Sequence, residues 1–241
     1  GIGRLVQAHL RGTEERGLFV VSAGGGVDIA RGGYAVAYGP VMAKADAQSA
    51  GGLKLPLKAG GLTVQVTDAR GVTRPAGIYF ASAGWGQINF VVPGEAAPGP
   101  ARVALVRDDG SRTMASITIA DTAPGFWTGT SCVGAALARE AATREPLWAC
   151  EGQACRTLAP KSTRIQFKGS GFRHAASAQA IEVTLGGVRV PVVAYGPSDR
   201  EMGVDWVTVE LPEAVRGLGE TDVVARVDGR VSNAVRVRLG S

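Results

Sequence analysis

The chain has 241 residues, of which 45% are hydrophobic and 20% are charged. This composition is typical of a soluble globular protein and excludes a disordered chain, and the length suffices for two domains. The net charge is +5, but the arginines stand singly in alternating runs with no aromatic residues between them, which argues against nucleic acid as a partner. No apolar run reaches the ~20 residues that a membrane-spanning helix needs.

Residues 1–16 precede the first regular pattern. Their alternate positions predict a strand rather than a helix, because three glycines in twelve residues leave little room for a stable helix. Such a strand has two alternatives: it packs within its own chain, or it joins the open sheet edge of a neighbouring copy and builds head-to-tail fibres. The residues of this predicted strand-exchange segment are Ile2, Arg4, Val6, Ala8 and Leu10.

A first module is predicted over residues 17–122. Apolar and polar residues alternate there in short runs separated by glycine and proline, which indicates strands with one buried face. The alternation predicts that Ile88, Phe90 and Val92 are buried together. A run of small residues, 42–52, is predicted to be a mobile loop, and residues 108–111 a hairpin turn. The predicted strands are 18–21, 34–38, 62–66, 77–81, 87–92, 101–107 and 114–119.

Residues 123–157 break this pattern and are predicted to be a short connector. Its alanine-rich stretch 135–142 has helix propensity, which Pro146 ends. Cys150 and Cys155 flank a glycine-containing loop, and their spacing suits a local disulfide that leaves Cys132 unpaired or bound to another chain. The sequence alone does not choose among the three pairings. Close loop cysteines favour an exported, oxidised protein, and the first residue, Gly1, indicates that an initiating segment has been removed, by processing or by design.

A second module, 158–241, repeats the order of runs of the first. Its strands are predicted at 163–169, 181–185, 188–195, 204–211, 222–227 and 234–239. Its buried set includes Trp206 or Val207, and because Trp206 follows the polar Asp205 we expect the indole in the core. The fold class is therefore all-β: two tandem immunoglobulin-like β-sandwich domains joined by a cysteine-containing, partly helical connector.

Particular motifs strengthen this prediction. The run Gln87-Ile88-Asn89-Phe90-Val91-Val92-Pro93 and the connector Ala123-Pro124-Gly125-Phe126 resemble a paired immunoglobulin-like region of the IPT/TIG type, found at the C-terminal ends of large secreted acidobacterial proteins. The second module matches it at 168–172 and 232–235. The resemblance covers about residues 17–240 and implies the fold and an exported setting, but supplies no catalytic residues. The cysteine-bearing insert departs from the family pattern.

The sequence shows no catalytic constellation. Its two histidines, His9 and His174, lack a nucleophile at a suitable spacing, and neither completes a zinc site with Cys150 and Cys155. The acidic turn 108–111 is explained by a hairpin better than by calcium, and the glycines 24–26 lack the rest of a phosphate-binding loop. We therefore predict no enzyme activity, no metal and no cofactor.

The tryptophans offer a binding alternative. Four indoles, at 85, 127, 148 and 206, suit stacking on sugar rings, and Trp85, between two glycines in a turn, is the best candidate for an exposed glycan contact. The sequence thus favours a non-enzymatic secreted or cell-surface structural protein with protein partners, identical subunits of a fibre among them, and leaves a glycan-binding accessory module with a polysaccharide partner as the alternative.

Overall fold

A computed structural model describes residues 17–40, 42–129, 134–151 and 154–240. The contacts divide the chain into two compact units. Unit 1 comprises the chain up to Asp121 together with Ser198–Gly203, and unit 2 comprises Thr122–Pro197 and the chain from Val204. The segment predicted to exchange strands, with Ile2 to Leu10 and His9, lies outside the described residues, as does Cys132.

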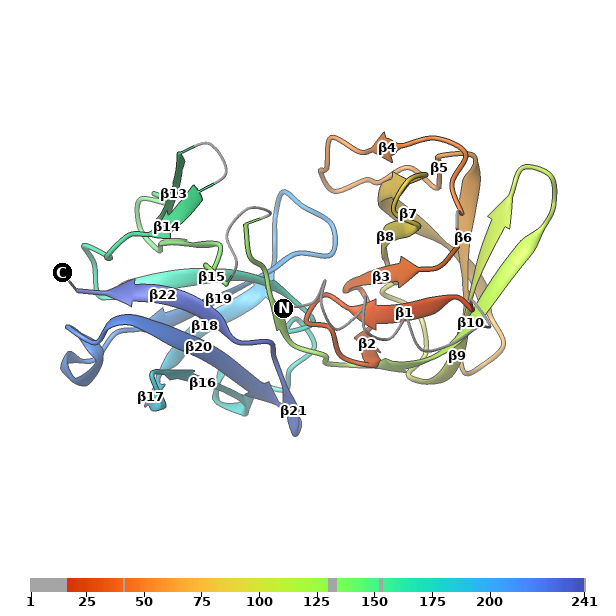
Figure 1. Cartoon of the computed structure of the whole chain (residues 1–241). Coiled ribbons are helices and arrows are strands. Elements are labelled where there is room, and N and C mark those ends of the chain that lie inside the picture. Colours follow the sequence, from red (N-terminus) through yellow and green to blue (C-terminus); the bar gives the residue numbers. More distant parts are fainter. Residues whose placement is uncertain (1–16, 41, 130–133, 152–153, 241) are drawn as a thin grey trace. The chain divides into compact units, whose positions relative to one another are not determined.

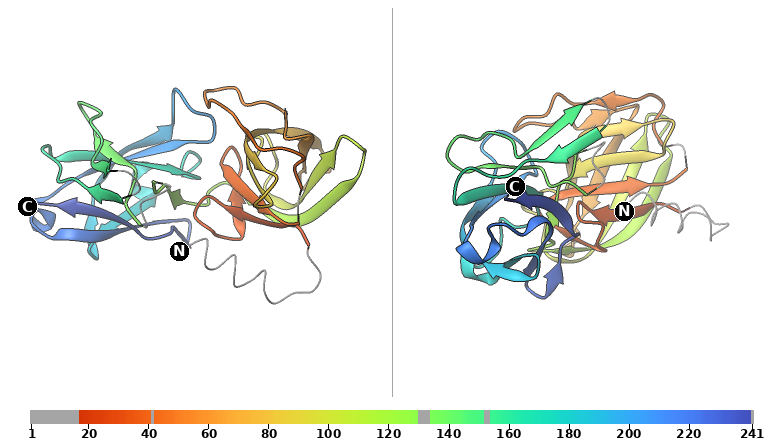
Figure 2. Two further views of the ribbon diagram at one scale, coloured as in Figure 1. Left: turned by 45° about the horizontal axis from the view of Figure 1, so that its top comes forward. Right: turned by 60° about the vertical axis from the view of Figure 1, so that its left-hand side comes forward.

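Unit 1 consists of strands joined by tight turns (Figure 1). The ladder runs β1-β3-β8-β7-β6-β9-β10-β2, with β4 paired to β7 and β5 to β6. Figure 2 gives two further views of the long β9–β10 hairpin in this unit. The strands are β1 (Phe19–Ser22), β2 (Asp28–Ala30), β3 (Tyr34–Tyr38), β4 (Ala47–Gln48), β5 (Lys58–Ala59), β6 (Leu62–Thr67), β7 (Thr73–Ser82), β8 (Gln87–Val91), β9 (Gly99–Arg107) and β10 (Arg112–Ala120).

The strand β7 connects the two halves of this ladder. Its first part, Thr73–Ala76, pairs with β6, and its second part pairs with β8. The register shifts between Ile78 and Phe80, and such a bulge bends a strand and increases its twist. The sheet can therefore fold over one core. Ile88, Phe90 and Val92 are fully buried there, as the alternation predicts.

The turn between β6 and β7 is organised by Asp68, whose side chain is buried. Its carboxylate accepts hydrogen bonds from the backbone N–H groups of Ala97, Val72 and Arg70, and it pairs with Arg74 at 2.8 Å. These donors, the amide of Ala97 foremost, lower the pKa of Asp68 to about 2. The predicted hairpin turn at 108–111 is confirmed, since the Arg107 N–H bonds to the Ser111 carbonyl and Gly110 has φ +81°.

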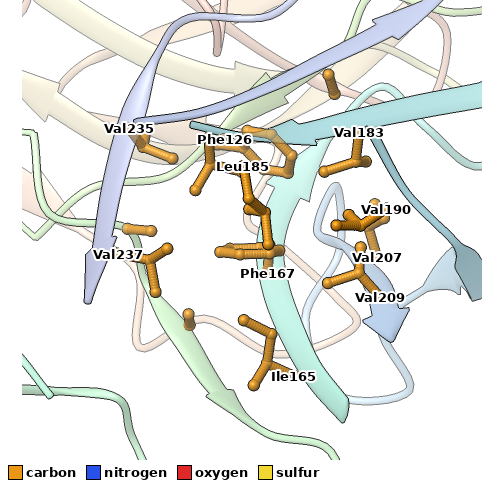
Figure 3. Close-up of a cluster of buried hydrophobic side chains, with 14 of the residues drawn as sticks. Phe126, Ile165, Phe167, Val183, Leu185, Val190, Val207, Val209, Val235 and Val237 are labelled. Atoms are coloured by element: carbon orange, nitrogen blue, oxygen red, sulfur yellow. The ribbon is translucent and has the colours of Figure 1, made fainter. Parts of the chain in front are cut away.

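Unit 2 has two larger sheets, β11-β15-β19-β18 with β12 beside β15, and β17-β16-β20-β21 with β22 beside β20. One core cluster draws residues from both sheets (Figure 3). The strands are β11 (Gly125–Phe126), β12 (Ala138–Glu140), β13 (Trp148–Glu151), β14 (Ala154–Thr157), β15 (Arg164–Ser170), β16 (Ile181–Leu185), β17 (Val188–Val190), β18 (Val192–Pro197), β19 (Asp205–Glu210), β20 (Gly219–Val227), β21 (Arg230–Val231) and β22 (Val235–Leu239), with 3₁₀ turns η1 (Ala178–Ala180) and η2 (Glu213–Val215).

Three sequence predictions for unit 2 are wrong, and the first concerns the connector. The stretch 135–142 is not helical: Ala138–Glu140 form β12, whose residues pair with Ile165, Gln166 and Phe167 of β15. Pairing that buries Ala138 at the core outweighs the small helix propensity of an alanine-rich run. The predicted connector thus contributes β11 to β14 to unit 2.

The second correction concerns the strand predicted at 188–195. It is divided at Pro191 into β17 and β18, which belong to different sheets. Proline has no N–H to donate to a ladder, so a continuous strand through this position is disfavoured. The chain changes sheet at that point instead.

The third correction concerns Trp206, which we expected in the core. Val207 and Val209 face the core, whereas Trp206 is half-buried on the opposite face of β19. The expectation failed because Asp205 is itself buried: its carboxylate pairs with the Arg173 side chain at 2.8 Å and accepts the Phe172 N–H at 2.8 Å. Burial raises the pKa of Asp205, and the Arg173 guanidinium opposes that shift.

Candidate functional site

The candidate site is the face of unit 1 that points away from its core. Because Ile88 and Phe90 point inward, Gln87 and Asn89 of β8 lie on the opposite face. Cross-strand register brings β3 and β7 residues beside them: Tyr38 lies opposite Gln87, and Phe80 lies opposite Asn89. The sheet therefore presents aromatic rings and amides side by side.

Trp85 stands at the end of this face, in the turn between β7 and β8. Its side chain is the most exposed large apolar group of the described residues, at 76%. The indole lies 6.4 Å from the ring of Phe80, centre to centre, with the ring planes inclined at 50°. An exposed indole supported by a second ring offers a flat apolar surface and an N–H donor.

The turn that carries Trp85 is held at both ends. The backbone N–H of Trp85 donates to the Ser82 hydroxyl at 3.2 Å. Gly86 has φ +59°, and a Cβ at this position would lie 2.0 Å from the carbonyl oxygen of Gly39, so a glycine is required. The Gly39 N–H in turn donates to the Gly86 carbonyl at 3.0 Å. These contacts fix the path of the turn relative to β3.

Polar groups on the same face are also ordered. The side-chain amide of Gln87 donates to the side-chain oxygen Oδ1 of Asn89 at 2.8 Å, which orients both side chains. Burial raises the pKa of Tyr38. Its hydroxyl can both donate and accept a hydrogen bond. The face thus combines ring surfaces with oriented hydrogen-bonding groups, which is the combination that a sugar ring requires: apolar C–H faces and peripheral hydroxyls.

The sequence did not predict the contribution of residues 42–52. Within this segment, Ala47 and Gln48 form β4, which pairs with β7 and places the exposed Gln48 opposite Phe80. A signal was present in the sequence: small and polar residues alternate from Ala43 to Gln48. Alanine alone on the apolar side made this alternation too weak to predict a strand. The segment therefore contributes a short strand at the border of the site, which the sequence did not predict.

The other predicted tryptophans are not part of unit 1. Trp127, Trp148 and Trp206 belong to unit 2. The Arg139 guanidinium lies 3.5 Å from the ring centre of Trp206, and the Lys168 amine 5.1 Å from that of Trp127, so these two indoles already stack against a cation. Trp148 is half-buried. Trp85 is the indole with the exposed surface.

The predicted disulfide residues lie in the β13–β14 hairpin of unit 2. Cys150 and Cys155 are direct cross-strand partners in its register. This places their backbones opposite each other, and the predicted 150–155 bond remains a prediction. Among the described residues, no group of three or more histidine, cysteine or acidic side chains is placed to hold a metal ion.

The chain was compared with protein families, curated proteins and solved structures. No family model matches the chain, and no curated protein does. Similar solved structures include SGBP-B of the mixed-linkage glucan utilization locus of Bacteroides ovatus, in complex with a mixed-linkage heptasaccharide. It is 14% identical with a TM-score of 0.35, and the match covers 89% of this chain and 43% of that one. The chain therefore spans less than half the length of that protein.

Two further matches cover nearly the whole of both chains. Bovine butyrophilin is 9% identical over 93% of this chain and 99% of its own, with a TM-score of 0.26. A titin tandem of immunoglobulin domains is 11% identical over 94% and 97%, with a TM-score of 0.24. Similarities this low carry no functional argument. The described part of the chain contains no helix long and apolar enough to cross a membrane.

Proposed function

We propose that this protein is a non-enzymatic, exported binding protein whose unit 1 holds polysaccharide on the face around Trp85. The observation that carries the proposal is the 76% exposure of the Trp85 side chain in a turn anchored by hydrogen bonds. An exposed indole whose turn is already fixed loses little conformational freedom when a ligand stacks on it.

The chemistry of the face matches a neutral sugar chain. Stacking of one pyranose ring on the indole would remove about 80 Å² of apolar surface from water, worth about 2 kcal/mol. The amides of Gln87 and Asn89 and the Tyr38 hydroxyl lie on the same side of the sheet and can exchange hydrogen bonds with sugar hydroxyls. The protein would bind the polysaccharide without cleaving it.

The test is titration of the full chain with a panel of neutral polysaccharides, mixed-linkage glucan among them, followed by tryptophan fluorescence. We expect a saturable change for at least one of them, and we expect Trp85→Ala to abolish it. Trp206→Ala is the matched control, because that indole lies in unit 2 and stacks on Arg139. A fluorescence change that persists in Trp85→Ala and disappears in Trp206→Ala would contradict the proposal.

The setting we propose is extracellular or at the cell surface, and the fold assignment we propose is immunoglobulin-like of the IPT/TIG type. Support for both comes from the sequence motifs at 87–93 and 123–126 and from the arrangement of strands within each unit. Assembly into fibres through residues 1–16 remains a separate prediction, since that segment lies outside the described residues.

A further inference from the structure

The turn that carries Trp85 is bound to a residue far from it in the sequence. Asp46, an exposed residue that directly precedes β4, accepts two hydrogen bonds through one carboxylate oxygen, Oδ1. The donors are the Ala83 backbone N–H at 2.7 Å and the Ser82 hydroxyl at 3.1 Å. Ser82 is the last residue of β7, and Ala83 begins the turn that leads to Trp85.

These contacts form a continuous relay from Asp46 to Trp85. The Ser82 hydroxyl donates a hydrogen bond to Asp46. At the same time it accepts a hydrogen bond from the backbone N–H of Trp85 at 3.2 Å. Ser82 is 3% exposed, so the hydroxyl in the middle of the relay is shielded from competing water. The carboxylate thereby fixes the orientation of the serine, which in turn fixes the backbone of the tryptophan.

The Asp46 carboxylate is well suited to this role. A charged acceptor makes shorter and stronger hydrogen bonds than a neutral one, and the 2.7 Å bond to Ala83 is at the short end of the normal range. The segment around Asp46 is itself secured, because the Lys44 N–H donates to the Gly60 carbonyl and β4 pairs with β7. The segment that carries Asp46 is therefore itself held to the sheet.

We propose that Asp46 is a positioning residue for polysaccharide binding: it holds the Ser82–Gly86 turn so that Trp85 presents its ring to the ligand before binding. This inference rests on the proposed function of the Trp85 face. Without the anchor, the turn must be ordered when the ligand binds, and that cost lowers affinity. We expect Asp46→Ala to weaken binding of the glycan found in the titration by about 3- to 10-fold.

The matched control is Asp109, which organises a different hairpin turn of unit 1, between β9 and β10, by accepting the Ser111 N–H at 2.9 Å. Asp109→Ala should leave the affinity unchanged. Asp46→Asn keeps an oxygen acceptor at the position and should restore affinity to within about twofold of the unmodified chain. A role limited to general stability would lower the melting temperature of both alanine variants and leave affinity unchanged in both.

A double-mutant cycle tests whether Asp46 acts through Trp85. If it does, Asp46→Ala has no further effect on affinity in the Trp85→Ala background. An equal loss in both backgrounds, or unchanged affinity in Asp46→Ala, would overturn the inference.

Fluorescence anisotropy decay of the Trp85 component, isolated by subtracting the signal of Trp85→Phe, supplies a ligand-free readout. It should show wider motion of the indole in Asp46→Ala than in Asp109→Ala, and equal motion would overturn the inference. If instead Trp85→Ala binds glycan like the unmodified chain, the proposed function fails, while the anisotropy measurement still decides whether Asp46 positions Trp85.

Discussion

Replacing Phe90 by alanine tests the assigned core of unit 1. The phenyl ring is 0% exposed, and its strand neighbours are Ala35 on β3 and Ile78 on β7, which are also fully buried. Truncation of a fully buried phenylalanine costs about 3–5 kcal/mol, because the ring returns to water and leaves a cavity. For a domain of this size each 1 kcal/mol corresponds to about 4–8 °C, so we expect the melting temperature of unit 1 to fall by about 12 °C or more.

Differential scanning calorimetry of the full chain measures this shift. Asn89→Ala is the matched control, one residue earlier on β8 and on the opposite face, and should change stability by about 0.5 kcal/mol or less. Phe167→Ala, in the core of unit 2, identifies the transition of that unit. If Phe90→Ala lowers the melting temperature no more than Asn89→Ala does, the register assigned to β8 is incorrect.

Three further predictions concern charges and cysteines. Arg173→Met should destabilise unit 2 by about 3–5 kcal/mol in urea unfolding, because it leaves the buried Asp205 carboxylate without its cation, and the loss should shrink when Asp205→Asn is added. Folding lowers the pKa of Asp68 to about 2, so its contribution to stability is present above pH 4 and is lost as the pH falls from 4 to 2. The melting temperature of Asp68→Asn should therefore depend less on pH in that range than the melting temperature of the unmodified chain. The same dependence on pH in both proteins would refute this. Non-reducing peptide mapping should find Cys150 bonded to Cys155, and a bond from either of them to the third cysteine would contradict the pairing.

The sequence predicted strands best where one face is buried and the other solvated. The prediction for 181–185 matches β16, because apolar and polar residues alternate cleanly there. The prediction for 34–38 matches β3, a run of tyrosine, valine and alanine bounded by glycines. It failed where a tertiary partner decides the outcome. Asp205 suggested an outward face, but Arg173, more than thirty residues earlier in the chain, makes its burial tolerable. The inward position of Asp205 turns the next residue, Trp206, outward.

The candidate site could be predicted only in part. Two glycines around Trp85 indicated an exposed turn, and the structure places the indole in one. The partner of that turn could not be inferred, because Asp46 reaches it where β4 pairs with β7, a contact between segments more than thirty residues apart. The alternation at 43–48 does not reveal which strand it pairs with.

Glycan binding by Trp85 is tested most directly by isothermal titration calorimetry with a defined oligosaccharide of the polysaccharide found in the titration. The comparison is between the unmodified chain, Trp85→Ala and Trp206→Ala. We predict that Trp85→Ala raises the Kd by about 30-fold, equivalent to the ~2 kcal/mol of ring stacking, and that Trp206→Ala leaves it within about twofold. A Kd for Trp85→Ala equal to that of the unmodified chain would contradict the assignment of the binding surface.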